Sequence, residues 1–401
     1  MLDRLSRGPG RKIVKIEPFE IAVPQSDLDD LRERLELARW PGEAPAGEWE
    51  SGVPVGYLRE LADHWRDRFD WRAAERRLNR FPQFMAEIDG ANVHLVHARS
   101  PEPDALPLLM THGWPSSVVE YLDVIDRLTD PRAHGGDPAD AFHVVAPSLP
   151  GFGFSGPTRQ KGWDVERIAR AWAELMRGLG YPRYAAHGGD LGVWISLTLA
   201  ALAPREVLGA HVNFLLTPPP NGPGGAGDLT GEDARRLELM AEYNRQAGYM
   251  KVQSTRPQTL AYGLTDSPVG QLAWIAEKFH EWTGPGERSV SWDRLLANVS
   301  VYWLTRTAGS SAQLYFEVAD RLPDSGRPPA DEPPLAVPLG VLACPYDAAL
   351  PVRSIARTRF PNIVQWSEWD HAGHFPALED PELFVRDVRS FARALPRDGG
   401  R

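Results

Sequence analysis

The string His-Gly-Gly-Asp-Leu-Gly at residues 187–192 constrains the fold of this chain more than any other feature. A short apolar segment, residues 183–186, precedes it, and a helix-forming segment, residues 191–200, follows it. This order predicts a strand, a sharp turn and a helix, with small residues that allow close approach of the backbones. The pattern is Gly-x-Ser-x-Gly with aspartate in place of serine. Asp190 is therefore a candidate nucleophile, although a string of this kind also occurs in ordinary turns, where the aspartate caps a helix.

Strands and helices alternate around this turn, which predicts an α/β fold with a mostly parallel central sheet. The predicted strands are residues 19–23, 83–88, 92–98, 106–110, 141–146, 183–186, 208–214, 339–343 and 362–366. The predicted helices are residues 28–37 (capped by Ser26 or Asp27), 55–69, 71–78, 118–128 (capped by Ser116), 164–179, 191–200, 232–248, 256–263, 268–282, 293–305 and 381–393. Residues 1–15 are expected to form a loose tail.

The order of these elements predicts four parts. Residues 1–82 form a mostly helical N-terminal segment, and residues 83–217 form the first part of the α/β core. Residues 218–310 form a helical lid, and residues 311–401 complete the core. The lid is expected over the carboxyl ends of the strands, where open α/β sheets bind ligands.

A nucleophile in such a turn needs a histidine and an acid, which follow it in the order acid, then histidine. Two histidines follow the last predicted strand, His371 and His374, and His374 is preferred because Gly373 leaves room around it. Asp347 follows the preceding strand and is preferred over Glu368 and Asp370, neither of which ends a strand. The acid would hold the imidazole in the correct tautomer and stabilise the imidazolium.

An oxyanion hole is predicted from two backbone N–H groups. Trp114 lies in the string His-Gly-Trp-Pro after an early strand, and Leu191 directly follows the candidate nucleophile. Backbone N–H groups in these two places are the usual oxyanion donors of such a turn. Trp114 and Phe152 are also predicted to contact the substrate.

With these strings the chain resembles the epoxide hydrolases of the microsomal type, within the α/β-hydrolase superfamily. The resemblance covers nearly the whole chain and rests on strings at residues 31–35, 39–41, 81–84, 112–115, 150–155, 188–190, 254–259, 266–270 and 373–375. It implies that Asp190 is the nucleophile, His374 the base and Asp347 its partner. It also implies that two lid tyrosines, Tyr249 and Tyr315, assist the reaction. Leu191 departs from relatives with tryptophan there, but the donor at that position is a backbone group.

An aspartate suits epoxide chemistry, because a carboxylate is ionised at neutral pH and attacks carbon without a base. The reaction would give an ester on Asp190, with the two phenols protonating the leaving oxygen. Water activated by His374 would then release a vicinal diol. The pathway served would be detoxification or secondary metabolism.

Composition sets further expectations. The net charge of −10 argues against a nucleic-acid partner. The single cysteine, Cys344, cannot form an internal disulfide, which favours a reducing compartment. With no apolar N-terminal segment and no long apolar run, the expected location is the bacterial cytoplasm. No cofactor and no metal site are predicted. The expected partner is a small epoxide, and the resemblance implies that the chain can form a homodimer.

Two other functions compete with epoxide hydrolysis. A haloalkane dehalogenase uses the same Asp–His–Asp triad, but it stabilises a halide with indole or amide N–H groups instead of phenols. Leu191 and the two tyrosines argue against it. The second is a catalytically silent binding protein of the same fold. Such a protein could have a blocked pocket and still contain all of the strings above.

Overall fold

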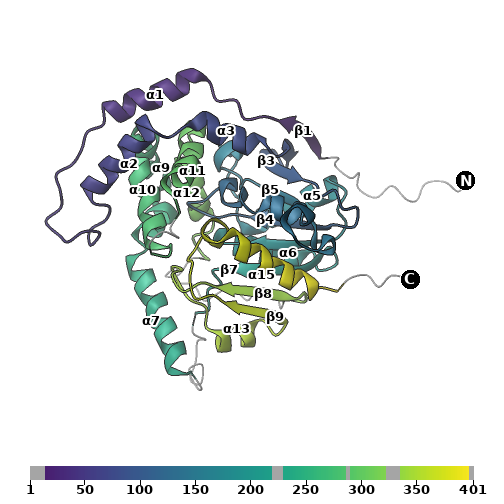
Figure 1. Cartoon of the computed structure of the whole chain (residues 1–401). Helices are drawn as coiled ribbons and strands as arrows, with labels where there is room; N and C mark the ends of the chain where they lie inside the picture. Colours follow the sequence, from purple (N-terminus) through teal and green to yellow (C-terminus); the bar gives the residue numbers. More distant parts are fainter. Residues whose placement is uncertain (1–13, 219–228, 286–289, 322–334, 397–401) are drawn as a thin grey trace, which may run out of the picture.

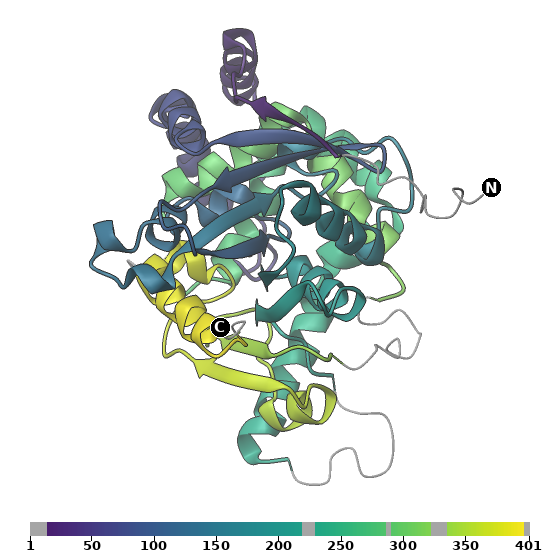
Figure 2. The same cartoon turned by 90° about the vertical axis from the view of Figure 1, so that its right-hand side faces the viewer.

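A sheet of nine strands forms the centre of the computed structural model, which describes residues 14–218, 229–285, 290–321 and 335–396. The strand order is β1-β2-β3-β5-β4-β6-β7-β8-β9, and Figure 2 shows the strands twisting from β1 at one edge to β9 at the other. The strands from β5 to β9 in this order are parallel, whereas β1, β2 and β3 pair antiparallel. Their bounds are Lys15–Phe19, Gln83–Ile88, Ala91–Ala98, Leu106–Thr111, Phe142–Pro147, Tyr184–Gly188, Val207–Asn213, Leu339–Ala343 and Ile363–Glu368 for β1 to β9. The predicted fold class is confirmed.

Helices cover both faces of this sheet. Alternate residues of a strand point to opposite faces, and in β4 Leu109 belongs to one apolar cluster while Leu108 and Met110 belong to another. Helices α5 and α6 contribute to the first cluster, and α4 and α15 contribute to the second. Their bounds are Ile125–Thr129 for α4, Val165–Gly178 for α5, Leu191–Leu202 for α6 and Pro381–Arg393 for α15. Two shorter helices, α13 (Arg353–Arg359) and α14 (Pro376–Glu379), complete the C-terminal part.

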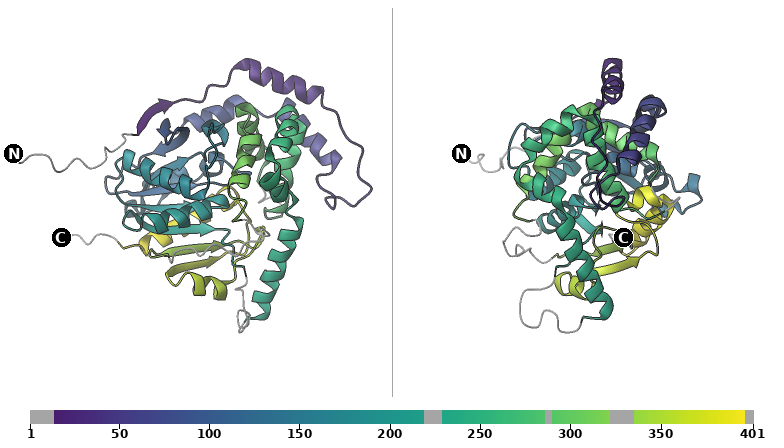
Figure 3. Two further views of the ribbon diagram at one scale, coloured as in Figure 1. Left: turned by 180° about the vertical axis from the view of Figure 1, so that it is seen from behind. Right: turned by 90° about the vertical axis from the view of Figure 1, so that its left-hand side faces the viewer.

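In the described residues between β7 and β8, six helices form a layer beside the sheet (Figures 1 and 3). They are α7 (Gly231–Gln246), α8 (Gly248–Thr255), α9 (Pro257–Asp266), α10 (Pro268–Glu281), α11 (Trp292–Thr305) and α12 (Ala308–Glu317). As expected for serine before proline, the Ser267 side chain caps α10 by accepting from the Gly270 N–H. Helix α7 extends towards the β9 edge of the sheet, where Arg236 bonds to Glu368.

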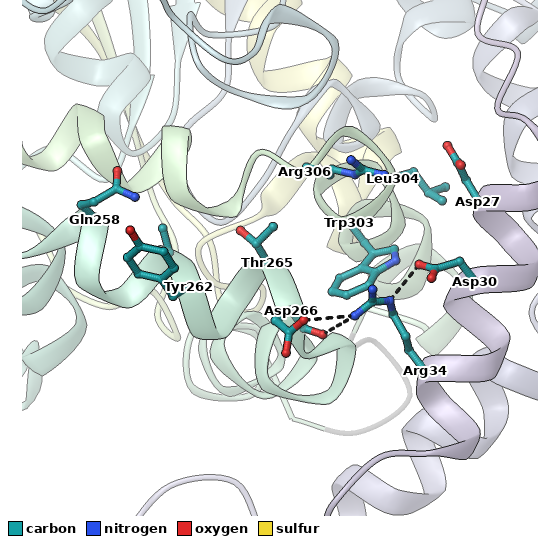
Figure 4. Close-up of a pocket in the computed structure, with 11 residues that line it drawn as sticks. Asp27, Asp30, Arg34, Gln258, Tyr262, Thr265, Asp266, Trp303, Leu304 and Arg306 are labelled. Atoms are coloured by element: carbon teal, nitrogen blue, oxygen red, sulfur yellow. Dashed lines mark hydrogen bonds and ion pairs between the residues drawn. The ribbon is translucent and has the colours of Figure 1, made fainter.

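The N-terminal helices wrap around the outside of this layer. They are α1 (Gln25–Glu36), α2 (Val55–Asp67) and α3 (Trp71–Asn79), and Figures 1 and 3 show α1 running along the outer side. Figure 4 shows Arg34 of α1 bonded to both Asp30 and Asp266, the latter from α9. A surface groove of about 690 Å³ lies between α1, α9 and the end of α11. Within it, Arg34 forms ion pairs with Asp30 and Asp266.

The sequence interpretation was wrong for the N-terminal strand and for the start of the first helix. The strand is Lys15–Phe19, paired with β2, and the following segment gives its Ile21 and Val23 N–H groups to side chains of α3. Helix α1 begins after Pro24 and has no side-chain cap, so Ser26 and Asp27 lie inside its first turn. Of the predicted tail, residues 1–13 lie outside the described residues.

The predicted helix at residues 118–128 is also wrong. The structure has a 3-10 helix, η1 (Val118–Tyr121), followed by α4, and the cap is Ser117 instead of Ser116. The β-branched pair at 118–119 lowers helix propensity. At the break, Asp123 forms ion pairs with arginines of α3 and α11, so tertiary contacts override the helical pattern. Among the described helices, none has the length and apolar character needed to cross a membrane.

Candidate active site

The turn between β6 and α6 holds Asp190 in a conformation that side chains rarely adopt. Its φ is 54° and its ψ is −124°, a region that costs of order 1–3 kcal/mol for a non-glycine residue. The residues two positions before and two positions after Asp190 must be glycines. A Cβ on Gly188 would lie 2.0 Å from the Gly192 carbonyl oxygen. A Cβ on Gly192 would lie 2.0 Å from the carbonyl oxygen of Thr111. The turn therefore places the Asp190 carboxylate at the carboxyl end of the sheet.

Three predicted residues meet at this end of the sheet. His374 Nδ1 lies 2.6 Å from Asp347 Oδ1, and its Nε2 lies 3.4 Å from Asp190 Oδ2. The first distance is a short hydrogen bond, and the second is an ion-pair distance that is too long for a strong one. Within the described residues Nε2 has no hydrogen-bond partner. The histidine is thus fixed on one side and points towards the carboxylate on the other.

The charge state of His374 follows from its neighbours. Burial alone would lower the pKa of the imidazole, but the carboxylates of Asp347 and Asp190 outweigh burial and raise that pKa to about 10. At neutral pH the histidine is therefore an imidazolium between two carboxylates. Removing the charge of either carboxylate would lower the pKa of His374.

The loop that carries His374 is held by contacts that sequence reasoning did not anticipate. The half-buried carboxylate of Glu379 accepts hydrogen bonds from the N–H groups of Gly373, Phe375 and Gly284. The His374 N–H donates to the Trp282 carbonyl oxygen at 2.7 Å. A Cβ on Gly373 would lie 2.1 Å from that same oxygen, so glycine is required there for backbone approach.

Both predicted oxyanion donors lie beside Asp190. The Trp114 N–H donates to Asp190 Oδ1 at 2.9 Å. A Cβ on Gly113 would lie 2.2 Å from the same oxygen, so only glycine leaves room for the carboxylate. Leu191 is the first residue of α6, and the first N–H groups of a helix have no intrahelical partner. One oxygen of Asp190 is therefore held by the Trp114 N–H, and the Leu191 N–H lies at the free start of the helix next to it.

The two predicted tyrosines come from the helical layer, Tyr249 from α8 and Tyr315 from α12. Their ring centroids are 6.0 Å apart, and the Trp114 ring stacks on Tyr249 with a centroid distance of 5.0 Å. Burial raises the pKa of both phenols well above the ordinary value, and the Tyr243 and Asp190 charges act in the same direction. Both phenols are therefore protonated at neutral pH and able to donate.

A small cavity of about 20 Å³ lies between these groups, which is room for about one water molecule. Its lining combines Asp190 and the tyrosines with mostly apolar side chains, and consists of Asp190, Leu191, Trp194, Phe214, Leu216, Tyr243, Tyr249, Met250 and Tyr315. The nucleophile and the phenols thus face one space.

Tyr243 is a further member that the sequence interpretation missed. It lies in α7, and its hydroxyl is 2.8 Å from the Tyr249 hydroxyl. Its distance of six residues from Tyr249 gave no signal, because the helix breaks at Ala247 between the two. Only the structure identifies this third phenol, because the arrangement of α7 and α8 brings its hydroxyl to that of Tyr249.

Other candidates lie outside this cavity. Phe152, predicted to contact substrate, does not line it; this side chain is fully buried, and its ring packs against His112 and Tyr302. His371 pairs with Asp370 and Asp380 instead of the nucleophile. The described residues include no group of His, Cys, Asp and Glu able to hold a metal ion.

Family models match both parts of the chain. The model for the epoxide hydrolase N terminus matches residues 16–121. The model for the alpha/beta hydrolase family matches residues 108–387 and therefore covers more than half of the chain.

Individual proteins give the same result. A Stigmatella aurantiaca protein whose name assigns it provisionally to the epoxide hydrolases is 47% identical over 95% of this chain and 85% of its own length. Epoxide hydrolase 1 of Sus scrofa is 34% identical over 97% of this chain and 92% of its own. The solved structure of Aspergillus niger epoxide hydrolase superposes with a TM-score of 0.85 at 29% identity, covering 97% of this chain and 99% of that one. This chain is a member of the epoxide hydrolase family, within the α/β-hydrolases, and is an enzyme.

Proposed function

We propose that this enzyme opens an epoxide by attack of Asp190 on a ring carbon and then hydrolyses the resulting ester to a vicinal diol. The observation that carries this proposal is the arrangement around the cavity. Asp190 faces Tyr249 and Tyr315 across it, and His374 with Asp347 stands behind the carboxylate. A nucleophile, an acid and a base are the groups that the two steps need.

In the first step Asp190 Oδ2 is the attacking atom, because Oδ1 is bonded to the Trp114 N–H. A bond forms between Oδ2 and a ring carbon while the ring C–O bond breaks. The departing oxygen takes a proton from the hydroxyl of Tyr249 or Tyr315. Because burial raises the pKa of both phenols, they stay protonated until negative charge develops on the departing oxygen.

In the second step His374 Nε2 takes a proton from water, and the water oxygen adds to Cγ of the Asp190 ester. The carbonyl oxygen, Oδ1, becomes negative and accepts hydrogen bonds from the N–H groups of Trp114 and Leu191. The intermediate then collapses, the Cγ–Oδ2 bond breaks, and the departing diol oxygen takes the proton from the imidazolium. The carboxylate is restored with one oxygen from water, and the remaining proton of that water returns to the tyrosinate left by the first step.

The pKa of His374 supports this order of events. In the free enzyme the two carboxylates raise it to about 10, which keeps the histidine protonated. Formation of the ester removes the negative charge of Asp190 and with it one of the two causes. The pKa of His374 then falls, which favours release of its proton to solvent and makes the base available once there is an ester to hydrolyse.

The cavity lining favours an apolar epoxide. Apart from the reacting groups it presents Leu191, Trp194, Phe214, Leu216 and Met250. Since the cavity itself has a volume of only about 20 Å³, a substrate must displace some of these side chains on entry. The cytoplasmic location, the homodimer and the four-part division of the chain stay predictions from the sequence, as does a role in detoxification or secondary metabolism.

The test is a product assay with purified wild type and Asp190→Ala on a panel of aryl and alkyl terminal epoxides, each with its matched haloalkane. Diol from wild type alone is the expected result. Halide release would assign the enzyme to the dehalogenases, and diol from both proteins would refute nucleophilic attack by Asp190. No product from wild type on any substrate would favour the silent binding protein.

A further inference from the structure

The loop after β4 carries the oxyanion donor, and helix α11 contacts that loop through side chains. Three alternate residues of α11 have polar side chains, namely Asn298, Ser300 and Tyr302. Each is only 1% exposed. Buried polar groups are costly unless they are hydrogen-bonded, so the partners of these three side chains indicate what they do.

Two of the three bind the loop itself. The Asn298 side-chain amide donates to the Pro115 carbonyl oxygen at 2.7 Å, and its own oxygen accepts from the Ser117 hydroxyl at 2.7 Å. The Tyr302 hydroxyl donates to the Ser116 carbonyl oxygen at 2.6 Å. Positions i and i+4 lie on one face of a helix, so one face of α11 binds two successive carbonyl groups of the loop.

These bonds fix the peptide groups next to Trp114. The Trp114 N–H, which donates to Asp190 Oδ1, belongs to the Gly113–Trp114 peptide unit. The Pro115 carbonyl held by Asn298 belongs to the second peptide unit after it. Release of the Pro115 and Ser116 carbonyls would let the loop rotate and would turn this N–H away from the oxygen. Displacement of a hydrogen-bond donor by a few tenths of an ångström already weakens its bond.

Helix α11 is itself anchored away from the loop. The Ser300 hydroxyl accepts from the Trp65 indole N–H of α2 at 2.9 Å. The Gln271 side chain of α10 donates to the Val299 carbonyl oxygen at 3.1 Å. The N-terminal helices and α10 therefore hold α11 in place, and α11 holds the loop.

We infer that Asn298 and Tyr302 are positioning residues for hydrolysis of the Asp190 ester, because they keep the Trp114 N–H aimed at the oxygen that becomes the oxyanion. This inference rests on the proposed function. The two chemical steps depend on that N–H unequally. In the first step negative charge leaves Asp190, so Oδ1 needs no further stabilisation. In the second step a full negative charge forms on Oδ1, and the donor is required.

The test is steady-state and single-turnover kinetics of Tyr302→Phe, which removes one hydroxyl, and of Asn298→Ala. We expect kcat to fall about 10-fold in the first, less than for complete loss of an oxyanion donor, and about 100-fold in the second, at the lower end of the range for such a loss. KM should fall by the same factor, leaving kcat/KM, which reports ester formation, close to wild type. Mass spectrometry of enzyme quenched during turnover should show the Asp190 ester accumulating.

Ser300→Ala is the matched control, since it removes an equally buried bond of the same helix that does not involve the loop. Because the Gln271 side chain still holds the Val299 carbonyl of α11, this variant should leave kcat and KM at wild-type values. Wild-type kcat in both loop variants would overturn the inference, and so would a fall in kcat/KM without accumulation of ester. Failure of the proposed function looks different, because wild type would then form no ester on Asp190 under any condition.

Discussion

The active site has two halves that are built in different ways. The core side consists of Trp114, Asp190, Asp347 and His374, which lie in loops at the carboxyl ends of strands. The helix side consists of Tyr243, Tyr249 and Tyr315, from α7, α8 and α12. On the core side, backbone hydrogen bonds and glycines without room for a Cβ fix each reacting group. On the helix side, ring contacts and one hydroxyl pair fix the phenols.

This difference follows from what each half must do. A nucleophile, a base and an oxyanion donor need fixed distances, because bonds form at those atoms. The proton for the departing oxygen can come from either of two phenols, Tyr249 or Tyr315. If one phenol is removed, the other can still donate. We therefore expect substitutions on the core side to reduce turnover more than single substitutions on the helix side.

The largest effect is expected on the core side from His374→Gln. Without the base, ester formation should continue and ester hydrolysis should slow by about 10²–10⁴-fold, the usual contribution of a general base. One equivalent of epoxide would be consumed rapidly and held on Asp190. Rapid-quench kinetics with intact-protein mass spectrometry measure both events. An enzyme that lost both steps equally would contradict the assignment of His374 to the second step.

On the helix side, Tyr249→Phe and Tyr315→Phe should each slow ester formation by about 10²-fold, at the lower end of general acid catalysis. The double variant should lose considerably more, since no phenol then remains to protonate the oxygen directly. Single-turnover rates of epoxide loss measure this step without interference from hydrolysis. If either single variant abolished the reaction, the two phenols would not be equivalent.

The pH dependence of stability tests the ion pair on the core side. The folded pKa of His374 is about 10, above its unfolded value near 6.5. Its contribution to stability is therefore fully present below pH 6.5 and is lost as the pH rises towards 10. Thermal unfolding of wild type should show a midpoint that declines over this range more steeply than that of His374→Gln. Parallel curves for the two proteins would mean that the histidine is neutral in the folded enzyme.

The smallest effect is expected from Tyr243→Phe. This change removes the hydroxyl that pairs with Tyr249 at 2.8 Å and nothing else. A neutral hydrogen bond contributes about 1 kcal/mol, so ester formation should slow by about fivefold while hydrolysis of the ester stays unchanged. Single-turnover kinetics separate these two rates. A rate of ester formation equal to wild type would limit Tyr243 to packing.

The same division explains what could be predicted from the sequence. The residues of the core side lie in short strings that contain glycines. These glycines are required because a Cβ would clash, as at Gly192 against the Thr111 carbonyl oxygen. The requirement is therefore visible as a local sequence pattern. The strands β2, β8 and the helix α15 were predicted with their observed bounds. Asp190, His374 and Asp347 were accordingly predicted to act together, and the structure brings them together.

The rest depends on contacts between distant segments. Helices α8 and α12 were not predicted as separate elements, and Tyr249 and Tyr315 were assigned only through the family resemblance. Tyr243 reaches the cavity because α7 turns into α8 at Ala247. Phe152 lies outside the cavity lining, because a string next to a strand end does not determine which way its aromatic ring points. Tertiary packing decides such orientations, and the local sequence carries no record of it.

The most direct test of the central claim is a single turnover in water enriched in heavy oxygen, with enzyme in excess over epoxide. Attack by Asp190 predicts an unlabelled diol, since its new oxygen comes from the carboxylate. It also predicts one heavy oxygen in the peptide that contains Asp190, because water adds to the ester carbonyl carbon. A labelled diol together with an unlabelled Asp190 peptide would show that water attacks the epoxide directly, and would contradict the account.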